Sequence, residues 1–214
     1  MSAMSTDFPT KEDSILDARY KFIYVDVGVN GRVSDGGVFR ESRLAEAINE
    51  ERLNLPASRP LPGKAIPVPY VFIADDASPL TNRILKPYPF RDLTPEKRVY
   101  NFRLSRAQRV VENAFGILTN RFRVFLSVMN LAPEKVETVT LAAVALHNFL
   151  CVHNTNAYTT FEDPNEVTVL PGLPLQGANH PANSAINIRN EFSAYFNSVW
   201  QFTLFSFGPL SPYL

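Results

Sequence analysis

The spacing of apolar residues predicts two strands and a short helix in the first third of the chain, and longer helices in the rest. Residues 21–28 and 68–74 are dense in β-branched and aromatic side chains, which is typical of strands. A glycine-rich turn after the first strand leads into a predicted helix over 38–50. Prolines make 54–69 an extended loop and 79–95 an irregular segment, because a helix interior does not accommodate proline.

Three longer segments repeat their apolar residues every three or four positions, as amphipathic helices do. The strongest pattern covers 104–125, where Ser105 and Gln108 resemble a capping box at a helix start. The other two cover 133–152 and 184–200. Strands followed by a group of helices indicate an α/β domain built in layers.

The composition fits a globular domain, since 45% of the 214 residues are hydrophobic. Cys151 is the sole cysteine, so no disulfide can form within the chain. This favours a reducing compartment, either the nucleus or the cytoplasm. The start of the chain has no signal-peptide pattern, and no uninterrupted apolar run reaches 18 residues, so we expect no membrane association.

A formal net charge of zero hides a separation of charge along the chain. Residues 83–123 hold ten Lys or Arg and three Asp or Glu, whereas the rest of the chain holds 11 basic and 18 acidic residues. Such a separation predicts one positive surface that faces a polyanion. The alternative is a basic helix face that is merely solvated.

Two acids have positions suited to a metal site. Asp75 and Asp76 follow the predicted strand over 68–74, and Glu112 lies on the margin of the apolar stripe of the predicted helix over 104–125. Mg²⁺ is held by carboxylate oxygens together with water, and paired metal ions can activate a phosphodiester. The alternatives are that an Asp caps the turn that follows, and that Glu112 pairs with neighbours on its own helix.

A second group of candidate ligands is weaker. His147 and Cys151 are four positions apart on one predicted helix face, and His153 lies off that face. A zinc site needs four protein ligands, or three and a water. We therefore expect these three side chains to have packing roles.

Several motifs in a fixed order resemble PIF/Harbinger-type DDE transposases, a family of nucleases. The motifs are Phe22-Ile23-Tyr24-Val25-Asp26-Val27-Gly28 with Gly31-Arg32-Val33-Ser34-Asp35, Ala74-Asp75-Asp76-Ala77-Ser78-Pro79-Leu80, Lys86-Pro87-Tyr88-Pro89, Tyr100-Asn101-Phe102-Arg103-Leu104-Ser105-Arg106-Ala107, Val111-Glu112-Asn113-Ala114-Phe115-Gly116-Ile117-Leu118, Leu146-His147-Asn148 and Trp200-Gln201. The resemblance covers about residues 16–201.

The resemblance implies an RNase H-like nuclease core, a mixed sheet with flanking helices. It also implies an Asp, Asp, Glu triad that holds catalytic Mg²⁺ or Mn²⁺. Asp75 matches the second Asp of the triad and Glu112 matches the Glu, whereas Asp17 resembles an Asp that follows the first catalytic strand. We therefore expect an N-terminally truncated member that lacks the first strand and its Asp. Ser78 departs from the aromatic residue that the family has at its position.

On this basis we divide the chain into a disordered N-terminus (1–15), a partial DDE domain (16–153), a loop (154–183), the last helix of the domain (184–201) and a tail (202–214). The resemblance makes DNA the partner, with a separate DNA-binding protein as a possible second one. The arginines expected to contact phosphates are Arg103, Arg106, Arg109, Arg121 and Arg123.

Two hypotheses follow. In the first, the chain is a metal-dependent DDE endonuclease or transposase domain, inactive by itself because the first Asp is missing. In the second, it is a non-catalytic remnant of a domesticated transposase that binds DNA or proteins. Steep salt dependence of DNA binding would favour a DNA-binding role.

Overall fold

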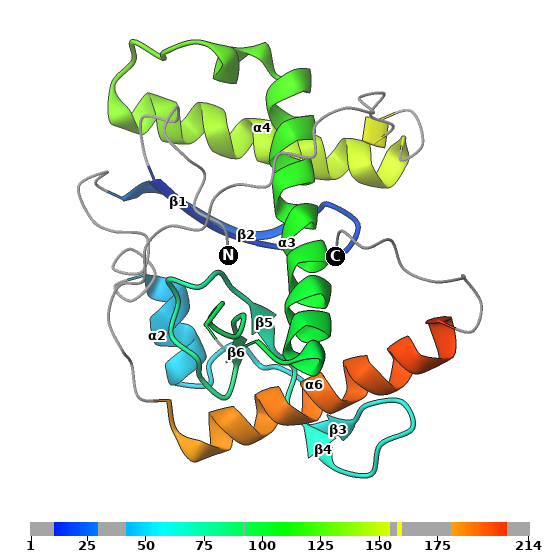
Figure 1. Cartoon of the computed structure of the whole chain (residues 1–214). Coiled ribbons are helices and arrows are strands. Elements are labelled where there is room, and N and C mark those ends of the chain that lie inside the picture. The colour runs from blue at the N-terminus through cyan, green and yellow to red at the C-terminus, as the bar shows by residue number, and fades with distance from the viewer. Residues whose placement is uncertain (1–10, 30–41, 92, 155–157, 160–180, 205–214) are drawn as a thin grey trace.

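A computed structural model describes residues 11–29, 42–91, 93–154, 158–159 and 181–204. The helix α3 (Pro95–Arg121) runs through the middle of the molecule, with α4 (Pro133–His153) across one end and α6 (Asn183–Leu204) across the other (Figure 1). Short strands lie beside α3, so the described residues form the α/β arrangement that the sequence predicts.

The first sheet is a hairpin of β1 (Lys11–Leu16) and β2 (Phe22–Val29), paired antiparallel. The strand predicted over 21–28 is thus present. β1 begins inside the stretch that we expected to be disordered, because its residues gain backbone partners in β2. The 1–10 part of that stretch lies outside the described residues.

The helix α2 (Arg43–Asn49) begins behind Ser42, whose hydroxyl oxygen accepts a hydrogen bond from the Ala45 amide at 3.1 Å. The start that we predicted, at residue 38, lies outside the described residues. Leu44 and Ile48 are buried and pack in one apolar cluster with residues of the neighbouring strands.

Two further small sheets follow. The predicted loop over 54–69 contains an antiparallel pair, β3 (Arg59–Pro60) and β4 (Pro67–Val68). β5 (Phe72–Ile73) pairs in parallel with β6 (Ile84–Leu85), which lies in the segment expected to be irregular. The described residues therefore form three two-stranded sheets, and the single mixed sheet that we expected is not formed among them.

The central helix is longer than its apolar pattern indicated. α3 starts at Pro95, nine residues before the predicted start, behind the N-cap residue Thr94. Proline suits the first helical position because its missing N–H would have no partner there. The capping box predicted at Ser105 is wrong, because Ser105 lies inside the helix and its hydroxyl donates to the Phe102 carbonyl at 2.9 Å.

The last two helices match their predicted positions closely. α4 packs on β2, and α6 packs on α3, where the rings of Phe196 and Tyr100 are 5.8 Å apart. Among the described residues, α4 is also the one helix long and apolar enough to cross a bilayer, although core helices of soluble proteins pass the same test. Our expectation of no membrane association is not tested by this feature.

Candidate functional site

The end of β5 is fixed against α3 by one side chain. The Gln108 amide group donates a hydrogen bond of 2.9 Å to the Ala74 carbonyl, 34 positions earlier in the chain. Ala74 is completely buried, so this carbonyl has no access to water and depends on a protein donor. The contact places Asp75, the second residue after β5, next to the central helix.

The carboxylate of Asp75 holds the turn that follows β5. Its Oδ1 accepts hydrogen bonds from the Ser78 amide at 3.1 Å and from the Ser78 hydroxyl at 2.9 Å. This is the turn-capping role that the sequence left as an alternative. Ser78 is buried. The residue that departs from the family pattern is therefore a buried hydrogen-bond partner of Asp75.

Asp76 has a different role from its neighbour. The ammonium group of Lys86 lies 3.5 Å from the Asp76 carboxylate and donates to the backbone carbonyls of Asp76 at 2.7 Å and Ser78 at 3.1 Å. Lys86 follows β6 directly, so it ties the end of that strand to the turn after β5. This arrangement gives the Lys-Pro-Tyr-Pro motif a structural explanation.

Glu112 lies on the same side of α3 as Gln108, because residues four apart in a helix are neighbours on one face. It is exposed, and within the part of the chain that the structure describes it forms no ion pair with Arg109 and no hydrogen bond with Gln108. The pairing that we weighed for Glu112 is therefore not formed. The face of α3 that carries Glu112 is the face that approaches the end of β5.

Few of the described side chains near the end of β5 are of a type that binds metal ions. Among the described residues, no three side chains of His, Cys, Asp or Glu come together as a metal site. Of the two acids that match the family pattern, Asp75 already binds Ser78 through one carboxylate oxygen. The described part of the chain therefore does not bring together the three acids that a triad would require.

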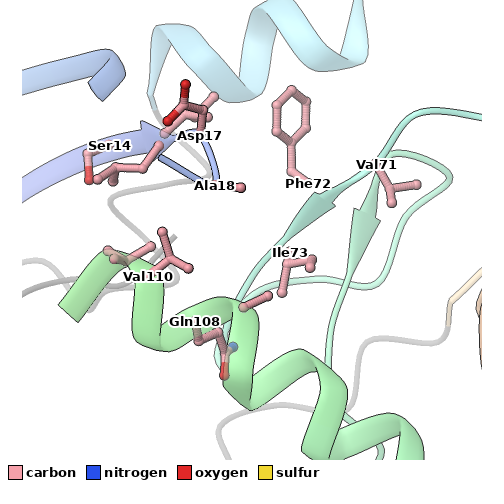
Figure 2. Close-up of a pocket in the computed structure, with 12 residues that line it drawn as sticks. Ser14, Asp17, Ala18, Val71, Phe72, Ile73, Gln108 and Val110 are labelled. Atoms are coloured by element: carbon pink, nitrogen blue, oxygen red, sulfur yellow. The ribbon is translucent and has the colours of Figure 1, made fainter. Parts of the chain in front are cut away.

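Asp17 lies in the loop that joins β1 and β2, beside Ala18 in the close-up of Figure 2. Its Oδ1 accepts hydrogen bonds from the amides of Arg19 at 2.8 Å and Lys21 at 3.0 Å. Burial raises the pKa of the Asp17 carboxyl, but the hydrogen bonds from Lys21 and Arg19 outweigh it and lower the pKa below 3.8. Asp17 is thus a hairpin cap in this structure.

The family assignment rests on a match to a family model. The model of the DDE superfamily endonucleases matches residues 13–148, which is more than half of the chain. The chain belongs to this DDE superfamily endonuclease family. No curated protein and no solved structure matches it. The match ends at Asn148, so it does not extend to the Trp200-Gln201 motif.

The DDE domain carries its predicted DNA contacts on different faces. Arg106, Arg109, Arg121 and Arg123 are exposed, and Arg103 is half-buried. At about 100° per residue, Arg103 and Arg121 lie on the side of α3 opposite Glu112. Arg121 also donates to the Tyr158 carbonyl at 3.3 Å. Arg98 is an exposed residue that we did not predict, and it lies within about 20° of Arg109 around the helix.

Two asparagines of the DDE domain each hold the backbone of one residue in another segment. Asn148 accepts from the Phe22 amide at 2.9 Å and donates to the Phe22 carbonyl at 2.8 Å. Asn101 does the same with Tyr88, at 2.8 and 2.9 Å. Both lie in motifs that carry the resemblance, and sequence reasoning gave them no role. The sequence did contain a signal for them, because a polar residue inside an apolar stretch of a helix needs a hydrogen-bond partner.

The buried His147 completes the contact between α4 and the hairpin. Its Nε2 lies 2.7 Å from the Tyr20 carbonyl oxygen and its Nδ1 lies 2.8 Å from the Tyr158 hydroxyl. A carbonyl only accepts, so Nε2 carries the proton and Nδ1 accepts from Tyr158. Burial lowers the pKa of His147 below 6.5. The packing roles predicted for His147 and Cys151 are confirmed, because both are buried side by side. His153 is instead exposed, and its ring contacts the exposed ring of Phe149.

Proposed function

We propose that the chain is a PIF/Harbinger-type member of the DDE family that binds DNA but does not cleave it by itself. Exposed arginines support DNA binding, because each phosphate that they neutralise releases condensed counterions. Arg106 and Arg109 lie about 60° apart on α3, and Arg98 extends the same surface. Arg123 follows on the short helix η1 (Arg123–Leu126). A nucleus is the compartment in which such a protein would meet DNA.

The small number of acidic side chains available to bind a metal ion supports the lack of cleavage. The family's chemistry uses three acids around divalent metal, and among the described residues no three His, Cys, Asp or Glu side chains come together as a metal site. Asp75 uses one oxygen in the turn with Ser78, which leaves fewer donors for Mg²⁺ or Mn²⁺. We therefore assign no metal-dependent step to this chain, and any cation held by Asp75 and Glu112 would be bound weakly.

A protein-binding role is the second candidate, and one surface favours it. Large apolar side chains of α4 remain exposed, among them Leu146, Phe149 and Val152 at 53, 56 and 60%. Exposed apolar patches of this kind mark interaction sites on soluble proteins. A separate DNA-binding protein of the transposition system is one partner that could cover it.

A cleavage assay tests the proposal. Supercoiled plasmid is incubated with the purified chain in Mg²⁺ or Mn²⁺, with Asp75→Ala as the matched variant. We expect no nicking above the level given by the variant. Turnover that Asp75→Ala abolishes would show that the two acids suffice, and the non-cleaving assignment would then be wrong.

A further inference from the structure

Phe90 is the most exposed large apolar side chain in the part of the chain that the structure describes, at 80%. It lies between β6 and α3, four residues before the N-cap residue Thr94, so the start of α3 is no more than about 14 Å away. This end of α3 packs on α6 (Figure 1). A single exposed apolar residue needs no explanation by itself, so the surroundings of Phe90 decide what it does.

The backbone just before Phe90 is held in place by two helices. Asn101 of α3 binds both backbone groups of Tyr88, at 2.8 and 2.9 Å. The Tyr88 hydroxyl donates to the side-chain oxygen of Asn190 of α6 at 3.0 Å. Pro89, which separates Tyr88 from Phe90, has a fixed φ angle. Phe90 therefore follows an anchored segment, and ordering it on a ligand costs little conformational entropy.

Basic side chains surround this anchored segment. Two cations lie over the ring of the anchored tyrosine, the Arg189 guanidinium at 4.0 Å and the Lys97 ammonium at 5.5 Å from its centroid. Arg91 is the next residue after the phenylalanine, and Arg98 lies in the first turn of α3; both are exposed. Among the described residues, none of these four forms an ion pair. Glu96 is the one acid in the first turn of α3, so the described side chains here carry a net positive charge.

An exposed aromatic ring beside cations without counter-ions indicates a ligand with flat apolar faces and negative charge. Single-stranded nucleic acid has both, because aromatic side chains stack on its bases while basic side chains hold its phosphates. A protein partner would have to bury Phe90 together with the cations beside it, and burying unpaired charge costs free energy. In a continuous duplex the bases already stack on one another, and unstacking them also costs free energy. A base that is already unpaired is therefore the better partner for Phe90.

We propose that Phe90 stacks on an unpaired base of the DNA that α3 binds, so that the chain prefers DNA with a bulge, gap or single-stranded end over continuous duplex. This inference rests on the proposed DNA-binding function and names the form of DNA that it uses. Arg98 connects the two surfaces, because it lies in the first turn of α3 and about 16 Å along the helix from Arg109. A strand that follows these arginines toward the start of α3 brings its next bases to Phe90.

Three labelled duplexes that differ at one nucleotide test the proposal. One is continuous, the second contains one unpaired adenosine, and the third has an abasic site in place of that adenosine. The abasic bulge keeps the extra phosphate and the flexibility of the bulged duplex but has no base to stack. We expect fluorescence anisotropy to give an affinity for the adenosine bulge at least about fivefold above that for either of the other two duplexes.

Substitutions of Phe90 separate stacking from other roles. Phe90→Leu should remove the preference for the adenosine bulge, because leucine is apolar but has no ring face, and Phe90→Trp should keep it. On the abasic bulge, Phe90→Leu should bind like the natural chain, because the ring acts only through the base. Its salt dependence should also be unchanged, since no phosphate contact is lost. Val128→Ala is the control, because Val128 is 79% exposed beyond the other end of α3, and it should change none of the three affinities.

The outcomes distinguish this inference from the function on which it rests. Absence of binding to all three duplexes, or affinities that do not change with salt, would overturn the DNA-binding function and this inference with it. Salt-dependent binding without preference for the adenosine bulge, or a preference that Phe90→Leu retains, would overturn the inference alone. So would a lower urea midpoint of Phe90→Leu with unchanged DNA affinities, because Phe90 would then pack against another part of this chain.

Discussion

The side chain of Gln108 donates a hydrogen bond to the carbonyl of Ala74, which connects the central helix to the end of β5. The bond lies one residue before Asp75 and one helical turn before Glu112. The two acids that match the DDE pattern thus lie on either side of a contact made by a residue that is not an acid.

Gln108→Ala should lower the free energy of unfolding by about 1–3 kcal/mol, because it leaves the fully buried Ala74 carbonyl without a donor. Urea denaturation followed by circular dichroism measures the change. Asn113→Ala on an exposed position of the same helix is the control, and it should have a much smaller effect. Equal effects of the two substitutions would mean that the Gln108 contact does not stabilise the fold.

Asp75→Asn should keep nearly all the stability of the chain, whereas Asp75→Ala should cost about 1–2 kcal/mol. The reason is that Asn retains the carbonyl oxygen that accepts from the Ser78 amide and hydroxyl, and Ala removes it. Thermal or urea unfolding of the two variants separates the turn role from a charge role. A large loss in Asp75→Asn would show that the negative charge itself is needed for folding.

Asn148→Ala should destabilise the contact between α4 and the hairpin by about 1–3 kcal/mol, because both backbone groups of the buried Phe22 lose their partner. Asn148→Asp is the sharper variant. It keeps the acceptor for the Phe22 amide and replaces the donor with a carboxylate oxygen that faces the Phe22 carbonyl. We expect it to be destabilised at neutral pH and to recover partly in acid, where the carboxyl is protonated. A variant as stable as the natural chain at neutral pH would contradict this geometry.

Stability should fall as the pH drops below about 6.5, the ordinary pKa of histidine. Burial lowers the pKa of His147, so below that value the unfolded chain binds a proton that the folded chain does not. The contribution of His147 is complete above the unfolded pKa and is lost as the pH falls toward the folded one. Urea midpoints between neutral pH and pH 5 measure it.

His153→Gln is the control for this pH dependence, since His153 is exposed. It should keep the slope of stability against pH, and His147→Gln should flatten it. A slope that survives in His147→Gln would assign the proton uptake to another group.

The sequence predicted the helices well and the strands less well. Apolar spacing located α4 and α6 within a few residues, because their buried faces repeat over many turns. The same signal missed the first turns of α3, where Thr94 and Pro95 start the helix without an apolar stripe. Two-residue strands such as β6 carry too short a pattern to detect, and their pairing depends on distant residues.

In the candidate site too, some features were visible in the sequence and others required the structure. Asp75 and Glu112 could be singled out because acids at a strand end and on a helix are visible in the sequence. The role of Gln108 could not, because its partner is a backbone carbonyl, which every residue has. The family pattern likewise marked Ser78 as a departure, whereas its burial and its two hydrogen bonds to Asp75 required coordinates.

We propose that the side of α3 that carries Arg98, Arg106 and Arg109 binds DNA. Fluorescence anisotropy of a labelled duplex from about 50 to 200 mM salt tests this most directly. We predict an affinity that falls steeply with salt, and a log–log slope smaller by about 2 in the variant with both Arg106→Ala and Arg109→Ala. Arg52→Ala, an exposed arginine of another segment that pairs with Glu46 and Glu50, should leave the slope unchanged. Flat salt dependence, or the same slope in the double variant as in the natural chain, would contradict the account.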